Sequence, residues 1–178
     1  MSDYRKFPNI ARRNVMQEYL EVPALARLLR LPRGRRILEV GCGRGIALPA
    51  ITHLCQPEML VGLDIDDALI AQARVHIAER QTKTVLVVGD VRALPFTDAS
   101  FDIVIDFGTC YHIDGSETAL CEIERALSPG GLFVYETPVS QLLSHPARSR
   151  GRSLPWAAAP NLTSRRGAGL WAARARLA

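Results

Sequence analysis

Residues 37–45 read ILEVGCGRG and constrain the fold more than any other part of the chain. The apolar side chains of Ile37, Leu38 and Val40 predict a short buried strand, and the apolar residues 46–54 predict a helix. Between them, glycines at alternate positions let the backbone approach a ligand closely, and the first N–H groups of the helix face the same place. The stretch therefore predicts a ligand site, and a plain tight turn between strand and helix is the alternative.

The spacing of the glycines indicates which class of ligand fits. A dinucleotide-binding loop has the form G-x-G-x-x-G, whose third small residue lets helix and strand pack closely around a pyrophosphate. Counted from Gly41, that third position falls on Ile46, and the glycines instead follow at Gly43 and Gly45. Glu39 precedes the loop, and a carboxylate suits a cationic ligand group better than a pyrophosphate. A nicotinamide (NAD(P)-binding) oxidoreductase is therefore an alternative, but Ile46 stands where its motif requires a small residue.

The stretch resembles motif I of the class I S-adenosylmethionine-dependent methyltransferases, which commonly reads (V/I)LE-x-G-x-G-x-G. The resemblance implies S-adenosylmethionine (S-adenosyl-L-methionine) as the cofactor, a molecule with a sulfonium, an ammonium and a carboxylate but no phosphate. An acid before the first glycine makes chemical sense beside such a molecule. Within the loop, the resemblance implies that the following residues bind the cofactor: Glu39, Gly41, Cys42, Gly43 and Gly45.

Two later strands are predicted to end in acids that hold the adenosine part of the cofactor. The strand over residues 59–66 contains Asp64, which lies 23 residues past Gly41, near the spacing at which an acid accepts hydrogen bonds from ribose hydroxyls. An ordinary solvated acid at a strand end is the alternative. The strand over residues 84–90 ends in Asp90, to which the resemblance assigns the adenine amino group. At the strand ends, the resemblance implies that the following residues bind the cofactor: Asp64, Ile65, Asp90, Val91 and Phe107.

Strand and helix patterns alternate five times between Arg35 and Thr137. Such alternation predicts an α/β fold with a parallel sheet wound by right-handed crossovers, here a Rossmann-like doubly wound sheet. The resemblance implies the strand order 3-2-1-4-5, which places the ligand-binding switch point between the first and fourth strands. Asp66 or Asp67 is expected to cap the helix of residues 68–80. The candidate cofactor residues then lie together at the carboxyl edge of the sheet.

The last strand–helix–strand unit is predicted over residues 102–138. Residues 102–107 form the fourth strand, a turn with the sequence SPGG follows the helix, and the fifth strand is expected to begin at Leu132. One face of the helix carries these apolar residues: Ala119, Leu120, Ile123, Ala126 and Leu127.

The loop after the fourth strand is expected to lie beside the reactive end of the cofactor. His112 in this loop is the predicted catalytic base, because an imidazole titrates near neutral pH and a base is needed when the acceptor must lose a proton. Tyr111 and Asp114 are weaker candidates. A packing role or an exposed loop position for His112 is the alternative.

The class of methyl acceptor follows from motifs that the chain lacks or contains. Amino-methylating enzymes of nucleic acids carry N/D-P-P-Y/F after the fourth strand, whereas residues 106–109 read DFGT, and no cysteine follows a proline. The run G-D-x-x-x-L-P-F at residues 89–96 resembles small-molecule members of the family. We therefore expect a small-molecule acceptor, methylated at oxygen, carbon or nitrogen, and no nucleic acid.

The chain is expected to divide into a helical N-terminal extension (residues 1–34), a cofactor-binding methyltransferase domain (35–140) and a basic tail (141–178). In the extension, Val15, Tyr19 and Val22 recur at helical spacing. The resemblance implies that the extension covers the cofactor or shapes the acceptor pocket, and helices that simply pack on one edge of the sheet are the alternative.

The tail carries the basic charge of the chain. The formal net charge is +4, but seven arginines and no acid lie after residue 146, and removing them leaves 15 basic residues against 18 acidic ones, or −3. The tail also lacks the alternating pattern of a sixth and a seventh strand, which the family normally adds. A disordered tail, a truncated or frameshifted end, and a basic anchor with Trp156 and Trp171 for nucleic acid or lipid are the alternatives.

The missing strand pair has functional consequences. It leaves the fifth strand as a sheet edge, which favours marginal stability, a homodimer over that edge, or cover by the tail. A truncated or degenerate methyltransferase-fold protein without catalysis is therefore a second functional alternative.

Cysteine usage and hydropathy bear on compartment. The four cysteines, Cys42, Cys55, Cys110 and Cys121, show no metal-ligand spacing, so we expect reduced thiols and no metal. The chain has no apolar leader and no run of about 18 apolar residues, which predicts a cytoplasmic protein without a transmembrane segment.

Overall fold

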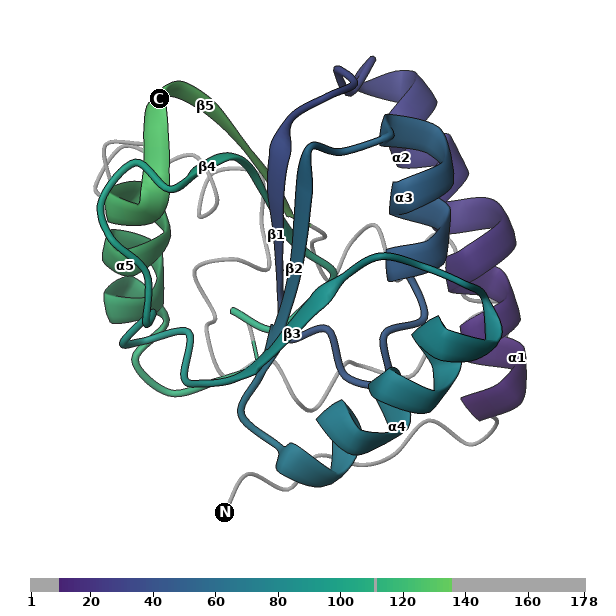
Figure 1. Ribbon diagram of the computed structural model, residues 1–178. Helices are drawn as coiled ribbons and strands as arrows, with labels where there is room; N and C mark the ends of the chain where they lie inside the picture. The colour runs from purple at the N-terminus through teal and green to yellow at the C-terminus, as the bar shows by residue number, and fades with distance from the viewer. Residues whose placement is uncertain (1–9, 111, 136–178) are drawn as a thin grey trace, which may run out of the picture.

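The computed structural model describes residues 10–110 and 112–135, which form a five-stranded parallel sheet with helices on both faces (Figure 1). The strands are β1 (Arg36–Val40), β2 (Met59–Asp64), β3 (Val85–Val88), β4 (Phe101–Asp106) and β5 (Leu127–Tyr135). The helices are α1 (Ile10–Met16), the π-helical η1 (Gln17–Glu21), α2 (Val22–Leu28), α3 (Leu48–Cys55), α4 (Asp67–Glu79) and α5 (Ser116–Ala126). The strand order β3-β2-β1-β4-β5 confirms the predicted Rossmann-like α/β fold.

The register places the glycine loop at the switch point of the sheet. β1 pairs in parallel with β2 on one side and with β4 on the other. Val40, the last residue of β1, lies opposite Leu63 of β2 and Asp106 of β4. The chain leaves the sheet directly after Val40, so the loop that follows lies between the carboxyl ends of three strands. Ligands of open α/β sheets bind at such a place.

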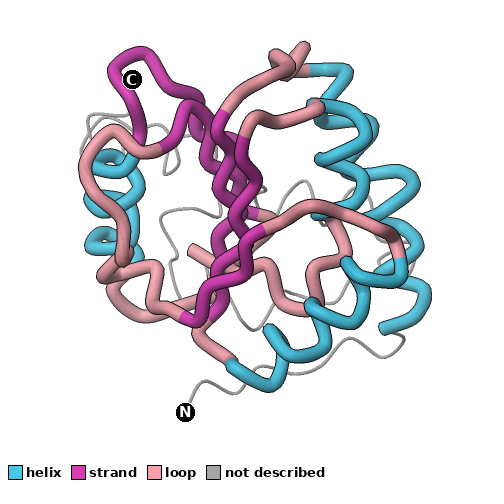
Figure 2. The backbone as a smooth tube through the Cα atoms, in the orientation of Figure 1, coloured by secondary structure: helices cyan, strands magenta, loops and turns pink. Residues whose placement is uncertain are grey.

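Helices cover both faces of the sheet (Figure 2), and the core divides into two layers, one on each face. On one face, alternate residues of β1, β2 and β4 pack against α5, whose buried residues are Ala119, Leu120, Ile123 and Ala126. On the other face, Ile37 and its neighbours pack against α3, α4 and Val22 of α2. Because β1 is covered on both faces, its sequence is almost continuously apolar. Its first residue, Arg36, is half-buried, and Glu39 is the one charged residue within the apolar run, where its side chain is nevertheless buried.

Helix ends follow the local sequence. Asp66 caps α4 by accepting hydrogen bonds from the N–H groups of Ala68 (2.9 Å) and Leu69 (3.2 Å), which confirms one of the two predicted caps. Asp67 lies instead in the first turn of α4, where the helix dipole stabilises a negative charge. Pro49 lies in the first turn of α3, where its missing N–H breaks no helical hydrogen bond.

The N-terminal extension is helical in its described part, and its three residues at helical spacing differ in burial. Val22 is 3% exposed, whereas Val15 and Tyr19 are 56% and 58% exposed. The π-helical turn η1 contains Tyr19 and ends directly before Val22, whose N–H donates to the Gln17 carbonyl, five residues back. This wider turn rotates the following residues away from the 3.6-residue period.

The predicted start of the fifth strand also changes. Leu127, expected on the helix, already pairs with Phe101 of β4, and Leu132 pairs with Ile103. Residues 128–131 therefore bulge out of the ladder rather than forming a free turn. Arg36 holds this bulge, because its Nη2 donates to Ser128 Oγ (2.8 Å) and to Asp102 Oδ1 (2.9 Å).

Several sequence-based expectations lie outside the described residues. These are the tail of residues 141–178, the missing sixth and seventh strands, and the boundary near residue 140. None of the helices in the described part of the chain combines the length and the apolar character needed to cross a bilayer.

We predict that Val22→Ala lowers the free energy of unfolding by about 2 kcal/mol, because it removes two buried methyl groups from the core. Val15→Ala, on the same helical extension but exposed, is the matched control and should change stability by less than about 0.5 kcal/mol. Urea unfolding of both variants measures the difference. Equal stabilities would show that the extension does not dock through Val22.

Candidate functional site

The loop after β1 is fixed by hydrogen bonds to β2. The Cys42 N–H donates to the Leu63 carbonyl (2.9 Å), and the Gly45 N–H donates back to the Cys42 carbonyl (2.8 Å), which closes a tight turn. The Gly43 N–H donates to Asp64 Oδ2 (2.8 Å). The glycine loop and the acid at the end of β2, far apart in sequence, therefore form one unit.

The three glycines of the loop meet three different surroundings. A Cβ on Gly41 would lie 1.7 Å from Thr109 Oγ1, so only glycine lets this loop touch the loop after β4. A Cβ on Gly45 would lie 3.1 Å from the Cβ of Ala73 in α4. A Cβ on Gly43 would meet no atom within 4 Å. Gly43 therefore borders open space, and its positive φ of +53° turns the backbone in a way that favours glycine.

Asp64 is 8% exposed, and its carboxylate holds the glycine loop by accepting backbone hydrogen bonds. One carboxylate oxygen accepts from Gly43, and the other accepts from the Asp66 N–H (2.9 Å). Two oxygens offer about four acceptor sites, so Asp64 retains capacity for further donors.

The end of β3 lies beside the end of β2, since the Gly89 N–H donates to the Asp64 carbonyl (2.9 Å). The next residue, Asp90, is gripped by Arg92, whose Nη2 and Nε lie 2.7 Å and 3.0 Å from Asp90 Oδ2. This hydrogen-bonded guanidinium lowers the pKa of Asp90. Arg92 Nη1 also reaches the Asp114 carbonyl (3.3 Å), so one side chain links the loop after β3 to the loop after β4.

Asp106 organises the loop after β4. Its carboxylate is 1% exposed and accepts from the N–H groups of Gly108 (2.8 Å), Thr109 (2.5 Å) and Cys110 (3.0 Å). The His112 N–H then donates to the Thr109 carbonyl (2.9 Å). The loop that carries the predicted base is thus anchored at its first turn.

Glu39 is buried without a hydrogen bond to Oε2. Burial first, and then the neighbouring charges of Asp64 and Asp106, raise its pKa to about 8. Arg13 of α1 opposes that shift. No motif in the sequence marks Arg13 as part of the site, because its approach depends on how the N-terminal helix packs.

The other predicted site residues occupy varied positions around the loop. Ile65 is 64% exposed, Val91 is buried, and Phe107 packs at the margin of the core. His112 is half-buried. Tyr111 lies outside the described residues.

The loop cysteines are not reactive nucleophiles. Burial and the nearby acids raise the pKa of the Cys42 thiol, and burial raises that of Cys110 well above its ordinary value. In the part of the chain that the structure describes, no group of His, Cys, Asp or Glu side chains could hold a metal ion.

Comparison with known proteins decides the family. The family model described as "Methyltransferase domain" matches residues 38–135, more than half of the chain. The chain belongs to the class I S-adenosylmethionine-dependent methyltransferases. The matched residues begin in β1 and end in β5, so they contain the glycine loop and every candidate cofactor residue. The nicotinamide oxidoreductase alternative receives no support.

Two curated relatives and one solved structure illustrate the similarity. A Mycolicibacterium smegmatis protein named "Probable S-adenosylmethionine-dependent methyltransferase" is 33% identical over 75% of this chain and 49% of its own length. A "Fatty-acid O-methyltransferase" of the same species is 35% identical over 57% of this chain and 36% of its own. A methyltransferase structure from Aquifex aeolicus, 17% identical, superposes with a TM-score of 0.70 over 91% of this chain and 81% of its own. The chain spans half or less of the length of these curated relatives.

One observation of the structure agrees with S-adenosylmethionine, the cofactor of this family, as the ligand of the glycine loop that follows β1. A Cβ added at Gly43 would meet no atom within 4 Å, and the buried acid Asp64 accepts a hydrogen bond from the Gly43 N–H. Such a loop gives room to a ligand without phosphate and provides negative charge near it.

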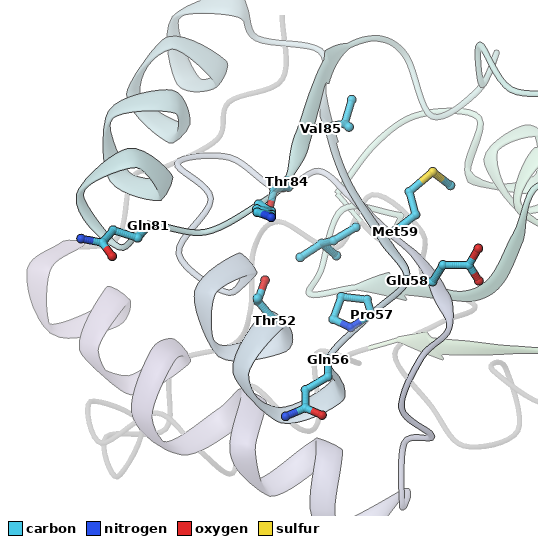
Figure 3. Close-up of a pocket in the computed structure, with 10 residues that line it drawn as sticks. Thr52, Gln56, Pro57, Glu58, Met59, Gln81, Thr84 and Val85 are labelled. Atoms are coloured by element: carbon cyan, nitrogen blue, oxygen red, sulfur yellow. The ribbon is translucent and has the colours of Figure 1, made fainter.

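A separate cavity of about 790 Å³ lies at the opposite edge of the sheet (Figure 3). Its lining includes Met59 and Val85, the first residues of β2 and β3, together with Thr52 and Gln56 from the end of α3. The glycine loop lies at the carboxyl ends of the strands, so this cavity cannot bring a methyl acceptor to the methyltransferase site.

Gly41→Ala should disrupt the contact between the two loops of the methyltransferase site. Gly34→Ala is the matched control, because Gly34 has a similar positive φ (+67° against +64°) but nothing within 4 Å of its Cβ position. Both variants carry a backbone strain of about 1–2 kcal/mol, and Gly41→Ala should lose about 1–3 kcal/mol more through overlap with Thr109. Chemical denaturation of both variants measures this difference, and equal losses would contradict the packing role.

Proposed function

We propose that this protein transfers a methyl group from S-adenosylmethionine to a small-molecule acceptor. The single observation that carries the proposal is the open space at Gly43, bordered by Asp64, at the carboxyl edge of a methyltransferase-family sheet. The name of the fatty-acid relative supports an apolar acceptor of the lipid class. The atom methylated, oxygen, carbon or nitrogen, is set by the acceptor.

The proposed placement of the cofactor follows the strand ends. Asp64 accepts from the ribose hydroxyls with its remaining acceptor capacity, and Asp90 accepts from the adenine amino group. Exposed Ile65, buried Val91 and half-buried Phe107 provide apolar surface near the adenine. The methionine part lies along the glycine loop, whose members are Glu39, Gly41, Cys42, Gly43 and Gly45.

When bound, the cofactor supplies a methyl carbon activated by a positively charged sulfur. The chain supplies orientation, which is the main contribution a protein makes to such a displacement. The contact of Thr109 with Gly41 and the anchoring by Asp106 hold the acceptor loop against the cofactor loop. His112, held by the Thr109 carbonyl, removes a proton at its imidazole nitrogen when the acceptor carries one.

The second candidate is a methyltransferase-fold protein without catalysis. It differs from the first candidate in whether the site binds the cofactor. Calorimetric titration with S-adenosylmethionine, S-adenosylhomocysteine and NAD separates the candidates. We expect both sulfur nucleosides to bind and NAD not to bind. Failure of both nucleosides to bind would support the degenerate protein.

The predicted partners and location stay predictions. In the described part of the chain β5 is an edge strand, and Leu132 on it is 38% exposed. This supports a homodimer over that edge, which sedimentation would detect. Binding of nucleic acid is not expected, and a cytoplasmic location is expected.

Gly43→Ala should keep the fold and lose the cofactor. The added methyl group enters space that the protein leaves open, so stability should match that of Gly34→Ala, which carries comparable strain. The dissociation constant for S-adenosylmethionine should rise tenfold or more, about 1.4 kcal/mol, and only in Gly43→Ala. Calorimetric titration measures it, and unchanged affinity would place the cofactor elsewhere.

His112→Ala should lower turnover by about 100-fold or more if the acceptor must lose a proton. A general base must be unprotonated to act, so the activity of the unsubstituted protein should rise with pH as the base loses its proton. This rise should disappear in His112→Ala. Formation of S-adenosylhomocysteine with a panel of fatty acids, phenols and amines measures both. His53→Ala, an exposed histidine on α3, is the control. An unchanged rate and pH profile would remove His112 from the mechanism.

A further inference from the structure

Three buried acids meet at the carboxyl edge of the sheet. Glu39 lies in β1, Asp64 ends β2 and Asp106 ends β4, and each is at most 8% exposed. Glu39 pairs with Gly62 of β2 and Ile105 of β4, so Asp64 lies two residues and Asp106 one residue beyond its partners. Buried carboxylates at neighbouring levels of adjacent strands repel one another unless donors or cations compensate them.

Compensation is unequal among the three acids. Both oxygens of Asp64 and both oxygens of Asp106 accept backbone N–H groups. Glu39 Oε2 is buried and has no hydrogen-bond partner. Of the three acids, Glu39 therefore gains least from being ionised and is the one that favours the protonated form.

The charged and titratable groups around Glu39 come from four elements. Asp64 of β2 and Asp106 of β4 oppose its ionisation, the buried Cys42 thiol follows it in the loop, and Arg13 of α1 favours its ionisation. Arg13 is also committed to Glu21, whose Oε2 accepts from Arg13 Nη1 (3.2 Å). Burial dominates, and it raises the pKa of Glu39 to about 8.

We propose that Glu39 holds a proton in the cofactor-free site and releases it to the solvent when the positively charged cofactor binds. The inference rests on the proposed placement of the methionine part along the glycine loop. The O–H bond of the Glu39 carboxyl breaks, the proton goes to the buffer, and the cofactor's positive charge lies near the carboxylate that forms. Because Oε2 is buried, this attraction acts through space rather than by direct contact.

The same arrangement distinguishes substrate from product. S-adenosylmethionine carries a sulfonium, whereas S-adenosylhomocysteine carries an uncharged thioether and has one positive charge fewer. Product binding should therefore release less of the proton. As pH rises toward about 8, affinity for S-adenosylmethionine should increase relative to affinity for S-adenosylhomocysteine, by up to tenfold per pH unit for one linked proton.

Calorimetric titration at pH 7 in two buffers of different ionisation enthalpy counts the protons released. We expect the count for S-adenosylmethionine to exceed that for S-adenosylhomocysteine by a large fraction of one proton. Glu39→Gln should abolish the excess, and Glu58→Gln, an exposed acid at the opposite edge of the sheet, should keep it. The α-amino group of each ligand has a pKa of about 8, and the number of protons released in Glu39→Gln corrects for its contribution.

A ligand-free measurement tests the same proton. The pKa of Glu39 is about 8 in the folded protein and near 4.5 in the unfolded chain, so only the unfolded chain loses the proton readily between these values. The melting temperature should therefore fall as pH rises from about 4.5 to about 8. Glu39→Gln should show a smaller fall, and Glu58→Gln should behave as the unsubstituted protein.

The outcomes separate the inference from the proposed function. Binding of S-adenosylmethionine with the same proton count as S-adenosylhomocysteine, or a count unchanged by Glu39→Gln, would overturn the inference alone. Failure of S-adenosylmethionine to bind would overturn the proposed function. Should Glu39→Gln not fold, the difference between the two ligands in the unsubstituted protein still decides.

Discussion

The contact between Gly41 and Thr109 joins the two loops on which the site depends. Thr109 occupies the position of a side chain that Gly41 does not have, and its hydroxyl lies 3.4 Å from the Val40 carbonyl. One loop follows β1 and carries the glycines, and the other follows β4 and carries His112. Because neither can move without the other, the proposed cofactor site and acceptor site keep a common geometry.

Negative charge is the second organising feature of this edge. Parallel strands deliver their carboxyl ends to one place, and here three of those ends bring acids into the core. Backbone N–H groups stabilise Asp64 and Asp106, so that these acids also shape the loops around them. Glu39 lacks such donors at one oxygen, and a cationic ligand is the partner that its position favours.

The N-terminal helices belong to this arrangement through packing more than through charge. Arg80, the C-cap residue that follows α4, pairs with Glu18 of η1, but the arginine side chain is 40% exposed, and exposed ion pairs contribute little. Val22 is buried against the core and provides the stronger attachment. Docking in this way brings Arg13 of α1 close enough to Glu39 to influence its charge.

The sequence by itself determined the elements and their order. Alternating patterns, the glycine loop, the Asp66 cap and the acids at strand ends are local features, because each depends on residues within a few positions of one another. The same local features mark Asp64 and Asp90 as candidates, and both lie within the residues that the family model matches.

Only the tertiary structure decided what each residue meets. The burial of Val22 but not of Val15, the bulge at residues 128–131, and the overlap that requires glycine at position 41 depend on partners distant in sequence. The charge state of Glu39 likewise depends on strands that lie on either side of it in space. Periodicity reports which residues can be buried, whereas crowding and electrostatics arise from the neighbours that the fold brings together.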